Sequence, residues 1–286
     1  MREQKFAVIG DPIAHSKSPE IHQVVFAHYK QNASYARVQV KKGALAPWIQ
    51  TVRTEGYAGF NVTMPHKTDI IAHLDEVAEE AALTGAVNTV VHRNGKLIGY
   101  NTDGAGFFRA LVEDGIKAVD KHIVILGAGA TAGVLAYRAV LAGAKSVTIL
   151  ARRGEQAKTL VTQLFKCTQA KNLHWDGMKP EQLAAHMAQA EILINATPQG
   201  MQGVTDQWKD LTFIQNLPSG AVVCDVINTP KETKFLKKAK ECGHQTQNGT
   251  AMLVHQAIEA DQLYLNRTIN EAKLVSEMMK IVGEKA

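Results

Sequence analysis

The chain has 286 residues, of which 45% are hydrophobic and 21% charged, an ordinary balance for a globular protein long enough to form two domains. Its 32 basic and 27 acidic residues give a net charge of +5, too small a surplus to indicate a nucleic-acid partner but suited to anionic ligands. No run of about 18 apolar residues is present and the N-terminus lacks the apolar core of a signal peptide, so we expect a cytoplasmic protein with no membrane partner.

The first block alternates short apolar runs with helically spaced ones, which predicts parallel strands joined by helices. Ser18-Pro19 has the form of a helix start, with serine as N-cap and proline at the first helical position. Asn94-Gly95 favours a type I′ turn in a hairpin over residues 88–101. The other expected elements are strands at 6–10, 34–40 and 59–63, a helix at 44–54, and a helical region that ends near Leu83.

A second block begins with a helix from 104 to about 117 and continues with four apolar strands separated by helical stretches. These strands are expected within residues 122–126, 146–153, 191–201 and 221–227. The tail from about residue 250 is helical and lacks a strand partner, so we expect it to pack back on the first block. The fold class expected is α/β, with an N-terminal α/β domain (1–103), a doubly wound parallel-sheet domain (104–240) and a returning C-terminal helical segment (241–286).

A glycine-rich sequence opens the second block. Gly127, Gly129 and Ala132 form G-x-G-x-x-A between a predicted strand and a predicted helix. Gly127 permits a tight turn, Gly129 lets the backbone approach a pyrophosphate, and Ala132 allows close helix packing, while the helix N-terminus offers N–H groups to phosphates. The alternative is a glycine-rich turn without a ligand. The context favours a Rossmann dinucleotide site.

The end of the next strand distinguishes the two nicotinamide dinucleotides. An NAD site needs Asp or Glu there for the ribose 2′-hydroxyl, whereas this chain has Ala151-Arg152-Arg153. Two guanidinium groups suit a 2′-phosphate, so we predict NADP (NADPH) as the cofactor. The alternative is that one or both arginines are solvated surface charges, and the nearby Glu155 leaves NAD use open.

Polar residues of the first block and the tail form a second candidate site. Ser16 and Ser18 precede a helix, whose positive end and two hydroxyls suit a carboxylate; alternatively, Ser18 caps the helix and Ser16 shapes a turn. Asn88 and Asp103 lie near strand ends, and Gln256 lies on the tail helix. Ligands of α/β proteins bind outside the carboxyl ends of strands, which favours ligand roles over turn or surface roles here.

The chain resembles the shikimate/quinate dehydrogenase family in stretches that run from residue 10 to about 257. They are GDPIAHSKSPEIH, GFNVTMPHK, GAVNTV, GYNTDGAGF, LGAGATA, INATPQGM and NGTAMLVHQA. NVTMPHK together with NTDG is highly specific to that family, whereas the glycine motif is not. The resemblance implies an enzyme with a substrate domain and an NADP domain, which reversibly reduces 3-dehydroshikimate to shikimate with NADPH in aromatic amino acid biosynthesis.

The resemblance also implies roles for particular residues. Lys67 and Asp103 match the family's dyad, in which the ammonium stabilises charge on the reacting oxygen and supplies the proton; the alternative for Lys67 is a surface lysine after a turn. Pro65 cannot donate to a ladder, so it should end the strand that carries Thr63. The substrate-binding positions are Ser16, Ser18, Thr63, Asn88, Asn228 and Gln256. The cofactor-binding positions are Gly127, Ala128, Gly129, Ala130, Thr131, Ala151, Arg152, Arg153, Val226 and Gly249.

Some positions depart from the family pattern. Asn228 stands where a substrate-contacting tyrosine is usual, and Ala151 and Arg153 replace the usual Asn and Thr. The alternatives are a quinate/shikimate dehydrogenase of broader substrate or NAD use, a dehydrogenase for another small acid, and a non-catalytic sensor of NADP and a shikimate-like acid. We expect a monomer or homodimer. No metal is expected, because the three cysteines are too widely spaced for a Cys-x-x-Cys motif.

Overall fold

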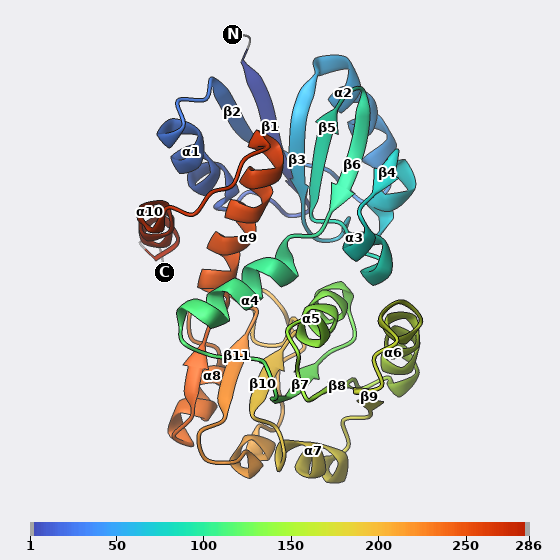
Figure 1. Ribbon diagram of the computed structural model, residues 1–286, viewed down its shortest axis with the longest axis vertical. Coiled ribbons are helices and arrows are strands. Elements are labelled where there is room, and N and C mark those ends of the chain that lie inside the picture. Colours follow the sequence, from blue (N-terminus) through green and yellow to red (C-terminus); the bar gives the residue numbers. More distant parts are fainter. Residues whose placement is uncertain (1–2, 284–286) are drawn as a thin grey trace. The chain divides into compact units, whose positions relative to one another are not determined.

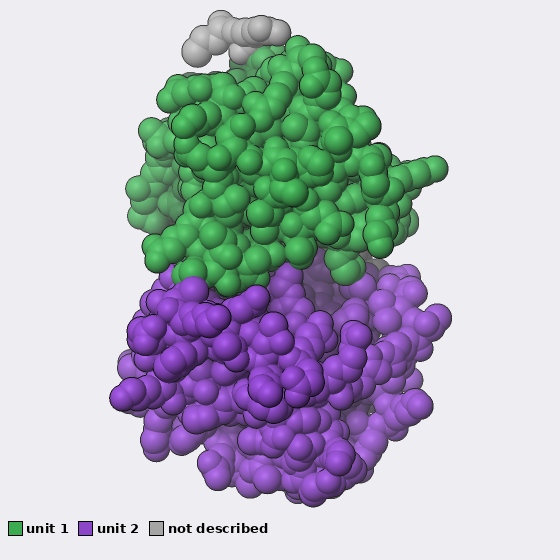
Figure 2. Space-filling view, turned by 90° about the vertical axis from the view of Figure 1, so that its right-hand side faces the viewer, with its two compact units in different colours: residues 1–106, 254–285 green, residues 107–253, 286 purple. Residues whose placement is uncertain are grey.

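The computed structural model describes residues 3–283, which fold into two compact units (Figure 1). Figure 2 colours the described residues of the first unit, 3–106 and 254–283, green, and the unit formed by Phe107–Leu253 purple. The sequence placed the changes of domain at 103/104 and 240/241 instead. The changes in the structure, at 106/107 and 253/254, fall inside the continuous helices α4 (Asp103–Glu113) and α9 (Gly249–Leu265), so no turn or linker marks them in the sequence.

The first unit is built on a mixed sheet with strand order β2-β1-β3-β5-β6-β4. Its strands are β1 (Gln4–Gly10), β2 (Ala33–Gln39), β3 (Tyr57–Val62), β4 (Glu76–Val77), β5 (Thr89–Arg93) and β6 (Lys96–Tyr100). β1 pairs in parallel with β2 and β3, whereas β5 runs antiparallel to both β3 and β6. The expectation of a purely parallel sheet is therefore wrong for this unit, because the β5–β6 hairpin pairs directly with β3.

Two local predictions for this sheet had different outcomes. Asn94 and Gly95 both have positive φ, 53° and 76°, as the expected type I′ turn of the hairpin requires. The single helical region expected before Leu83 is wrong, because β4 interrupts it to pair with β6. The segment instead forms the 3₁₀ helix η1 (Asp69–His73), then β4, then α3 (Glu79–Thr84). Strand pairing here overrides the local preference for helix.

Both faces of the first sheet are covered by helices (Figure 1). They are α1 (Ser18–His28), α2 (Leu45–Glu55) and α9, while α10 (Ala272–Gly283) packs on α1. Successive residues of β1 face opposite cores, since Ala7 packs with Trp48 of α2 while Phe6 packs with Phe26 of α1 and Tyr264 of α9. Because α10 also packs on α1, the tail returns to the first block as expected.

The second unit contains a parallel sheet with strand order β12-β11-β10-β7-β8-β9. Its strands are β7 (His122–Leu126), β8 (Ser146–Leu150), β9 (Leu173–Asp176), β10 (Ile192–Asn195), β11 (Val222–Asp225) and β12 (Gln245–Gln247). The four expected strands are confirmed. The sequence did not predict the short edge strands β9 and β12. β9 has mixed polarity and β12 is entirely polar, so neither contains an apolar run.

The second sheet is doubly wound, as predicted. Its helices are α5 (Ala130–Leu141), α6 (Gly154–Thr168), α7 (Pro180–Met187) and α8 (Lys234–Glu241), with the 3₁₀ helix η2 (Thr212–Asn216). Ile123 and Ile125 of β7 pack in one core with α5 and α6, while Val124 and Leu126 pack in another with α7 and α8. The strand order reverses beside β7, so the carboxyl end of β7 is the switch point where α/β proteins bind ligands.

Residues 3–283 show no sign of a membrane span or of a metal centre. No helix there combines the length and apolar character that crossing a membrane requires. No group of three or more His, Cys, Asp or Glu side chains in the same residues is placed to hold a metal ion. The three cysteines, Cys167, Cys224 and Cys242, are free thiols.

Candidate active site

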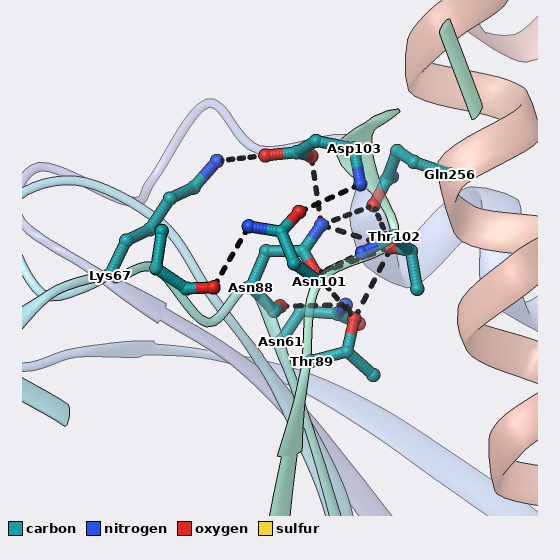
Figure 3. Close-up of polar contacts among 9 residues, drawn as sticks. Asn61, Lys67, Asn88, Thr89, Asn101, Thr102, Asp103 and Gln256 are labelled. Carbon is teal, nitrogen blue, oxygen red and sulfur yellow. Dashed lines mark hydrogen bonds and ion pairs between the residues drawn. The ribbon is translucent and has the colours of Figure 1, made fainter. Parts of the chain in front are cut away.

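A lysine and an aspartate from separate segments form an ion pair in the first unit (Figure 3). Lys67 follows β3 after a turn in which the His66 N–H donates to the Thr63 carbonyl, and Asp103 is the first residue of α4. Lys67 Nζ lies 2.6 Å from Asp103 Oδ2, and the two side chains are 20% and 9% exposed. The fold therefore brings together the two residues that the resemblance pairs, in surroundings where charge interactions are stronger than in water.

The Asp103 carboxylate is held at both oxygens. Asn88 Nδ2 donates to Oδ1 at 2.8 Å, opposite the lysine on Oδ2, and Asn101 Oδ1 accepts from the Asp103 N–H at 3.0 Å. Asn88 is itself fixed, because its Oδ1 accepts from the Thr102 N–H and the Thr89 hydroxyl, each at 2.9 Å. Figure 3 shows these amides and hydroxyls gathered around the carboxylate. Asn88, expected as a substrate ligand, thus also orients Asp103.

Gln256 joins this group from α9. Its Oε1 lies 3.5 Å from both Asn88 Nδ2 and Thr102 Oγ1, and the residue is buried. The approach of α9 to α4 depends on Gly106, because a Cβ at that position would lie 2.4 Å from the Gln256 backbone nitrogen. The glycine therefore allows Gln256 to reach Asn88 and Thr102, the neighbours of Asp103.

Substitution of Gly106 by alanine is expected to push α9 away from α4, since the contacting atoms are backbone and cannot swing aside. We expect the variant to lose about 1–3 kcal/mol of unfolding free energy in urea titrations. The control is Gly154→Ala, where the added Cβ makes an ordinary 3.4 Å contact with the Trp175 ring. Equal stability of the two variants would contradict this account of Gly106.

The two serines of the predicted carboxylate site lie side by side at the start of α1. The Ser16 hydroxyl donates to Ser18 Oγ at 3.1 Å, and the Ser18 N–H donates to Ser16 Oγ at 3.3 Å. The prediction that Ser18 is the N-cap is wrong, because α1 begins at Ser18 and Lys17 occupies the cap position without a side-chain hydrogen bond. The Ser18 hydroxyl is thus not used to cap the helix.

Thr63 is half-buried and directly follows β3, which ends before Pro65 as expected.

The glycine turn of the second unit has the geometry of a phosphate site. Gly127 adopts φ 109°, and a Cβ there would lie 3.0 Å from the Ala196 carbonyl oxygen. Gly129 is the N-cap of α5, where no side chain caps the helix and a Cβ would meet nothing within 4 Å. No side chain therefore caps the first-turn N–H groups, and the space beside Gly129 is open, which fits a bound pyrophosphate. Ala128 precedes Gly129, Ala130 and Thr131 form the first turn of α5, and Ala132 is fully buried as predicted.

The two arginines after β8 are exposed. Arg152 pairs with Asp206 at 2.7 Å, and the side chains are 69% and 50% exposed. Such an exposed pair contributes little stability, so an anion with two negative charges can compete for the guanidinium. Arg153 is the N-cap of α6, while Ala151 is buried. The exposed cations and the open helix end fit the 2′-phosphate and pyrophosphate of NADP.

The remaining expected cofactor positions also lie in the second unit. Gly249 is required where it stands, because a Cβ there would lie 2.2 Å from the Val226 carbonyl oxygen. The Gly249 N–H donates to the Ile227 carbonyl at 2.9 Å, so the fold places Val226 and Gly249 against each other. Asn228 is half-buried in the segment after β11 and belongs to this unit, whereas the other five expected substrate residues belong to the first.

The sequence did not single out a buried carboxylate at the end of β11. Asp225 accepts from the Thr233 hydroxyl at 2.7 Å, the Ile227 N–H at 3.1 Å and Asn195 Nδ2 at 3.1 Å. Burial raises its pKa to about 6, against the opposing effect of these hydrogen bonds. Asn195 and Asp225 end neighbouring strands, so the strand-end pattern that selected Asn88 and Asp103 applies to them too. The cluster ties β10, β11 and the start of α8 together.

The glycine turn and exposed arginines of the second unit fit a dinucleotide, and the paired lysine of the first unit carries an amine of the kind that can donate a proton. Together with the doubly wound sheet, these features define a nicotinamide-dependent oxidoreductase. Residues 8–90 match the model of the shikimate dehydrogenase substrate binding domain, and residues 110–230 match that of shikimate/quinate 5-dehydrogenase. The chain belongs to the shikimate dehydrogenase family.

Individual relatives match nearly the whole chain. The shikimate dehydrogenase (NADP(+)) of Symbiobacterium thermophilum is 38% identical over 260 residues, 91% of this chain and 88% of that protein. The structure of shikimate 5-dehydrogenase from Listeria monocytogenes, in complex with shikimate and NAD, has a TM-score of 0.87 at 32% identity, covering 98% and 96% of the two chains. Ligand-free 5-ketofructose reductase of Gluconobacter sp. strain CHM43 has a TM-score of 0.84 at 32% identity, covering 99% of each chain.

Proposed function

We propose that this protein is an NADP-dependent shikimate dehydrogenase that reversibly reduces 3-dehydroshikimate to shikimate in aromatic amino acid biosynthesis. The observation that carries the proposal is the contact of Lys67 Nζ with Asp103 Oδ2 at 2.6 Å. It is supported by a relative of the same family that is named shikimate dehydrogenase (NADP(+)). We place the enzyme in the cytoplasm, whose reducing conditions suit three free thiols, as a monomer or homodimer.

NADPH, when bound, supplies the hydride that reduces the keto carbon of the substrate. The Lys67 ammonium stabilises the negative charge that develops on the substrate oxygen and donates a proton from Nζ. Asp103 orients the ammonium through Oδ2, and Asn88 holds the carboxylate in place through Oδ1. In the reverse direction, neutral Lys67 accepts the proton from the substrate hydroxyl.

The substrate carboxylate is assigned to Ser16 and Ser18, whose hydroxyls lie at the positive end of α1. The ring hydroxyls are assigned to Thr63, Asn88 and Gln256, supported by the contacts of Asn88 and Gln256 around Asp103. Asn228 would offer an amide to the substrate in place of a tyrosine ring. Each of these groups binds by hydrogen bonds, which suits a small polyhydroxy acid.

The cofactor pyrophosphate is assigned to the turn Gly127–Ala128–Gly129 and the first N–H groups of α5, including those of Ala130 and Thr131. Arg152 and Arg153 would hold the 2′-phosphate beside the end of β8, next to Ala151. Val226 and Gly249 would line the nicotinamide, an assignment supported by their close contact.

The test of the function is a spectrophotometric assay of the purified protein at 340 nm. Shikimate with NADP should give the highest kcat/KM, at least about 10-fold above quinate with NADP or shikimate with NAD, the loss expected when one pocket contact is mismatched. Binding of both ligands without turnover would identify a sensor and refute the proposal. A higher kcat/KM with quinate would instead identify a quinate dehydrogenase.

Replacement of Arg152 by alanine should raise the KM for NADP by about 10- to 100-fold, the value of one or two charged hydrogen bonds to phosphate. The KM for NAD should change little, because NAD has no 2′-phosphate. The matched control is Arg53→Ala, which removes a guanidinium paired with Asp75 on the first unit. An equal rise in the KM values for NADP and NAD would show that Arg152 does not bind the 2′-phosphate.

A further inference from the structure

A buried histidine and aspartate connect two helices of the first unit, and neither belongs to the residues assigned above. His22 of α1 and Asp261 of α9 are in contact through Nδ1 and Oδ1 at 2.7 Å, and both side chains are 0% exposed. The two residues are 239 positions apart in the chain. Their contact therefore fixes α1, which begins with Ser18, relative to α9, which carries Gln256.

The pair is costly to bury. His22 Nε2 and Asp261 Oδ2 have no hydrogen-bond partner among residues 3–283, and burial raises the pKa of Asp261 against the opposing effect of His22. Desolvation offsets much of the attraction in buried ionisable pairs, so apolar residues of similar size often stabilise a protein as well or better. A contribution to stability alone is thus a poor explanation for this pair.

His22 is connected to the carboxylate site. It lies one helical turn after Ser18, and its ring stacks on Tyr35, with centroids 4.5 Å apart and planes inclined by 8°. The Tyr35 hydroxyl donates to Asn61 Oδ1 at 2.6 Å, and the Ser18 side chain lowers the pKa of Tyr35 against the larger effect of burial. His22 therefore supports the Tyr35 ring and, through Asp261, anchors the helix that begins with Ser18.

Asp261 is connected to the other end of the site. Tyr264, one turn further along α9, donates to the same Asn61 oxygen at 3.0 Å, and Asn61 Nδ2 donates to Thr89 Oγ1 at 3.0 Å. Thr89 in turn donates to Asn88, which holds the catalytic carboxylate. Tyr35 of β2 and Tyr264 of α9 therefore donate to the same buried asparagine, which lies beside Asn88 and Thr89 (Figure 3).

We propose that His22 and Asp261 are positioning residues for substrate binding, which set the separation between the carboxylate site at Ser18 and the hydroxyl contact at Gln256. This inference rests on the proposed function. A cyclic polyhydroxy acid is rigid, so it cannot adjust to groups that move apart at its two ends. A displacement of about 1 Å in such a site can lower kcat/KM by up to about 100-fold.

The decisive variant replaces both residues by leucine, His22→Leu with Asp261→Leu, which removes the polar pair and leaves apolar side chains in its place. We expect a folded protein whose Kd for shikimate, titrated without cofactor, rises about 10-fold or more. The shikimate KM should rise with it, while kcat and the Kd for NADP stay within about twofold. Wild-type shikimate binding by a folded double variant would overturn the proposal.

Two conservative variants decide the matter if the double variant does not fold. Asp261→Asn keeps an oxygen that accepts from His22, so it should bind shikimate within about twofold of wild type. Asp261→Glu keeps the charge but lengthens the side chain by one methylene, so it should weaken binding as the double variant does. Equal shikimate affinity of these two variants would overturn the proposal.

The packing control is Phe26→Leu, one turn beyond His22 on α1, where a fully buried ring loses volume without any change in polar contacts. It should lower the melting temperature and leave the shikimate Kd unchanged; a raised Kd would reduce the His22–Asp261 effect to general destabilisation and refute the positioning role.

The wild-type protein distinguishes failure of the proposed function from failure of this inference. If it neither binds nor oxidises shikimate, the proposed function fails and this inference with it, whereas an active wild type with unaffected variants refutes only the inference.

Discussion

Replacement of Lys67 by alanine should lower kcat by about 100- to 10,000-fold, the usual contribution of a general acid, while the KM for shikimate stays within a few-fold. The reason is that Nζ acts on charge that appears on the substrate oxygen only as the hydride arrives. Lys67 is 20% exposed and already paired with Asp103, so the ammonium is held in position before the substrate binds. Steady-state assays with NADP and shikimate measure both constants.

The control for Lys67 is Lys96→Ala, which removes an ammonium paired with Glu76 at 2.5 Å in the same unit. That pair is about half exposed, and Lys96 has no assigned role, so kcat should stay within about twofold of wild type. Retention of full kcat by Lys67→Ala would remove this residue from the mechanism. A matched rise in KM with unchanged kcat would make it a binding residue instead.

Replacement of Asp103 by asparagine should lower kcat by about 100- to 1,000-fold, within the range for loss of an oriented acid–base group. The carboxylate accepts from Lys67 at one oxygen and from Asn88 at the other. Asparagine has one oxygen, so its NH₂ group must face one of these two donors. Either the lysine loses its acceptor or the Asn88 amide is left with a repulsive contact, and both outcomes displace the proton donor.

Asp75→Asn is the matched control for Asp103, because Asp75 accepts from Arg53 and from the Leu97 N–H in the same unit but has no assigned role. It should change stability slightly and leave kcat unchanged. Circular dichroism and a melting curve for both variants separate misfolding from loss of chemistry. An Asp103→Asn enzyme with wild-type kcat would show that the lysine needs no carboxylate partner.

Asn88 illustrates how the structure changed the meaning of a predicted residue. The sequence indicated a ligand-binding role because Asn88 lies near a strand end. In the structure its Nδ2 donates to Asp103 and Thr102, while its Oδ1 accepts from Thr89 and the Thr102 N–H. A side chain with this many protein contacts has little freedom to turn, so its amide presents a fixed edge to whatever binds beside it.

Functional residues could be recognised from the sequence only where neighbouring positions in the chain form a pattern. The glycine turn was recognisable because strand, Gly127, Gly129 and helix follow one another directly in the chain. His22 and Asp261 carried no comparable signal, since a histidine in an amphipathic helix and an aspartate in a tail helix resemble ordinary surface residues. Only the packing of α1 and α9 in the first unit makes them a buried pair.

By itself the sequence determined the family and the two α/β blocks, and it predicted the cofactor turn and the lysine–aspartate pair, because these depend on short motifs and on the local spacing of apolar residues. The tertiary structure decided the mixed first sheet, the unit boundaries inside α4 and α9, and the partner of each buried polar side chain. Those outcomes depend on strand order and helix packing between distant segments, such as Gly106 against Gln256, and no local pattern encodes such contacts.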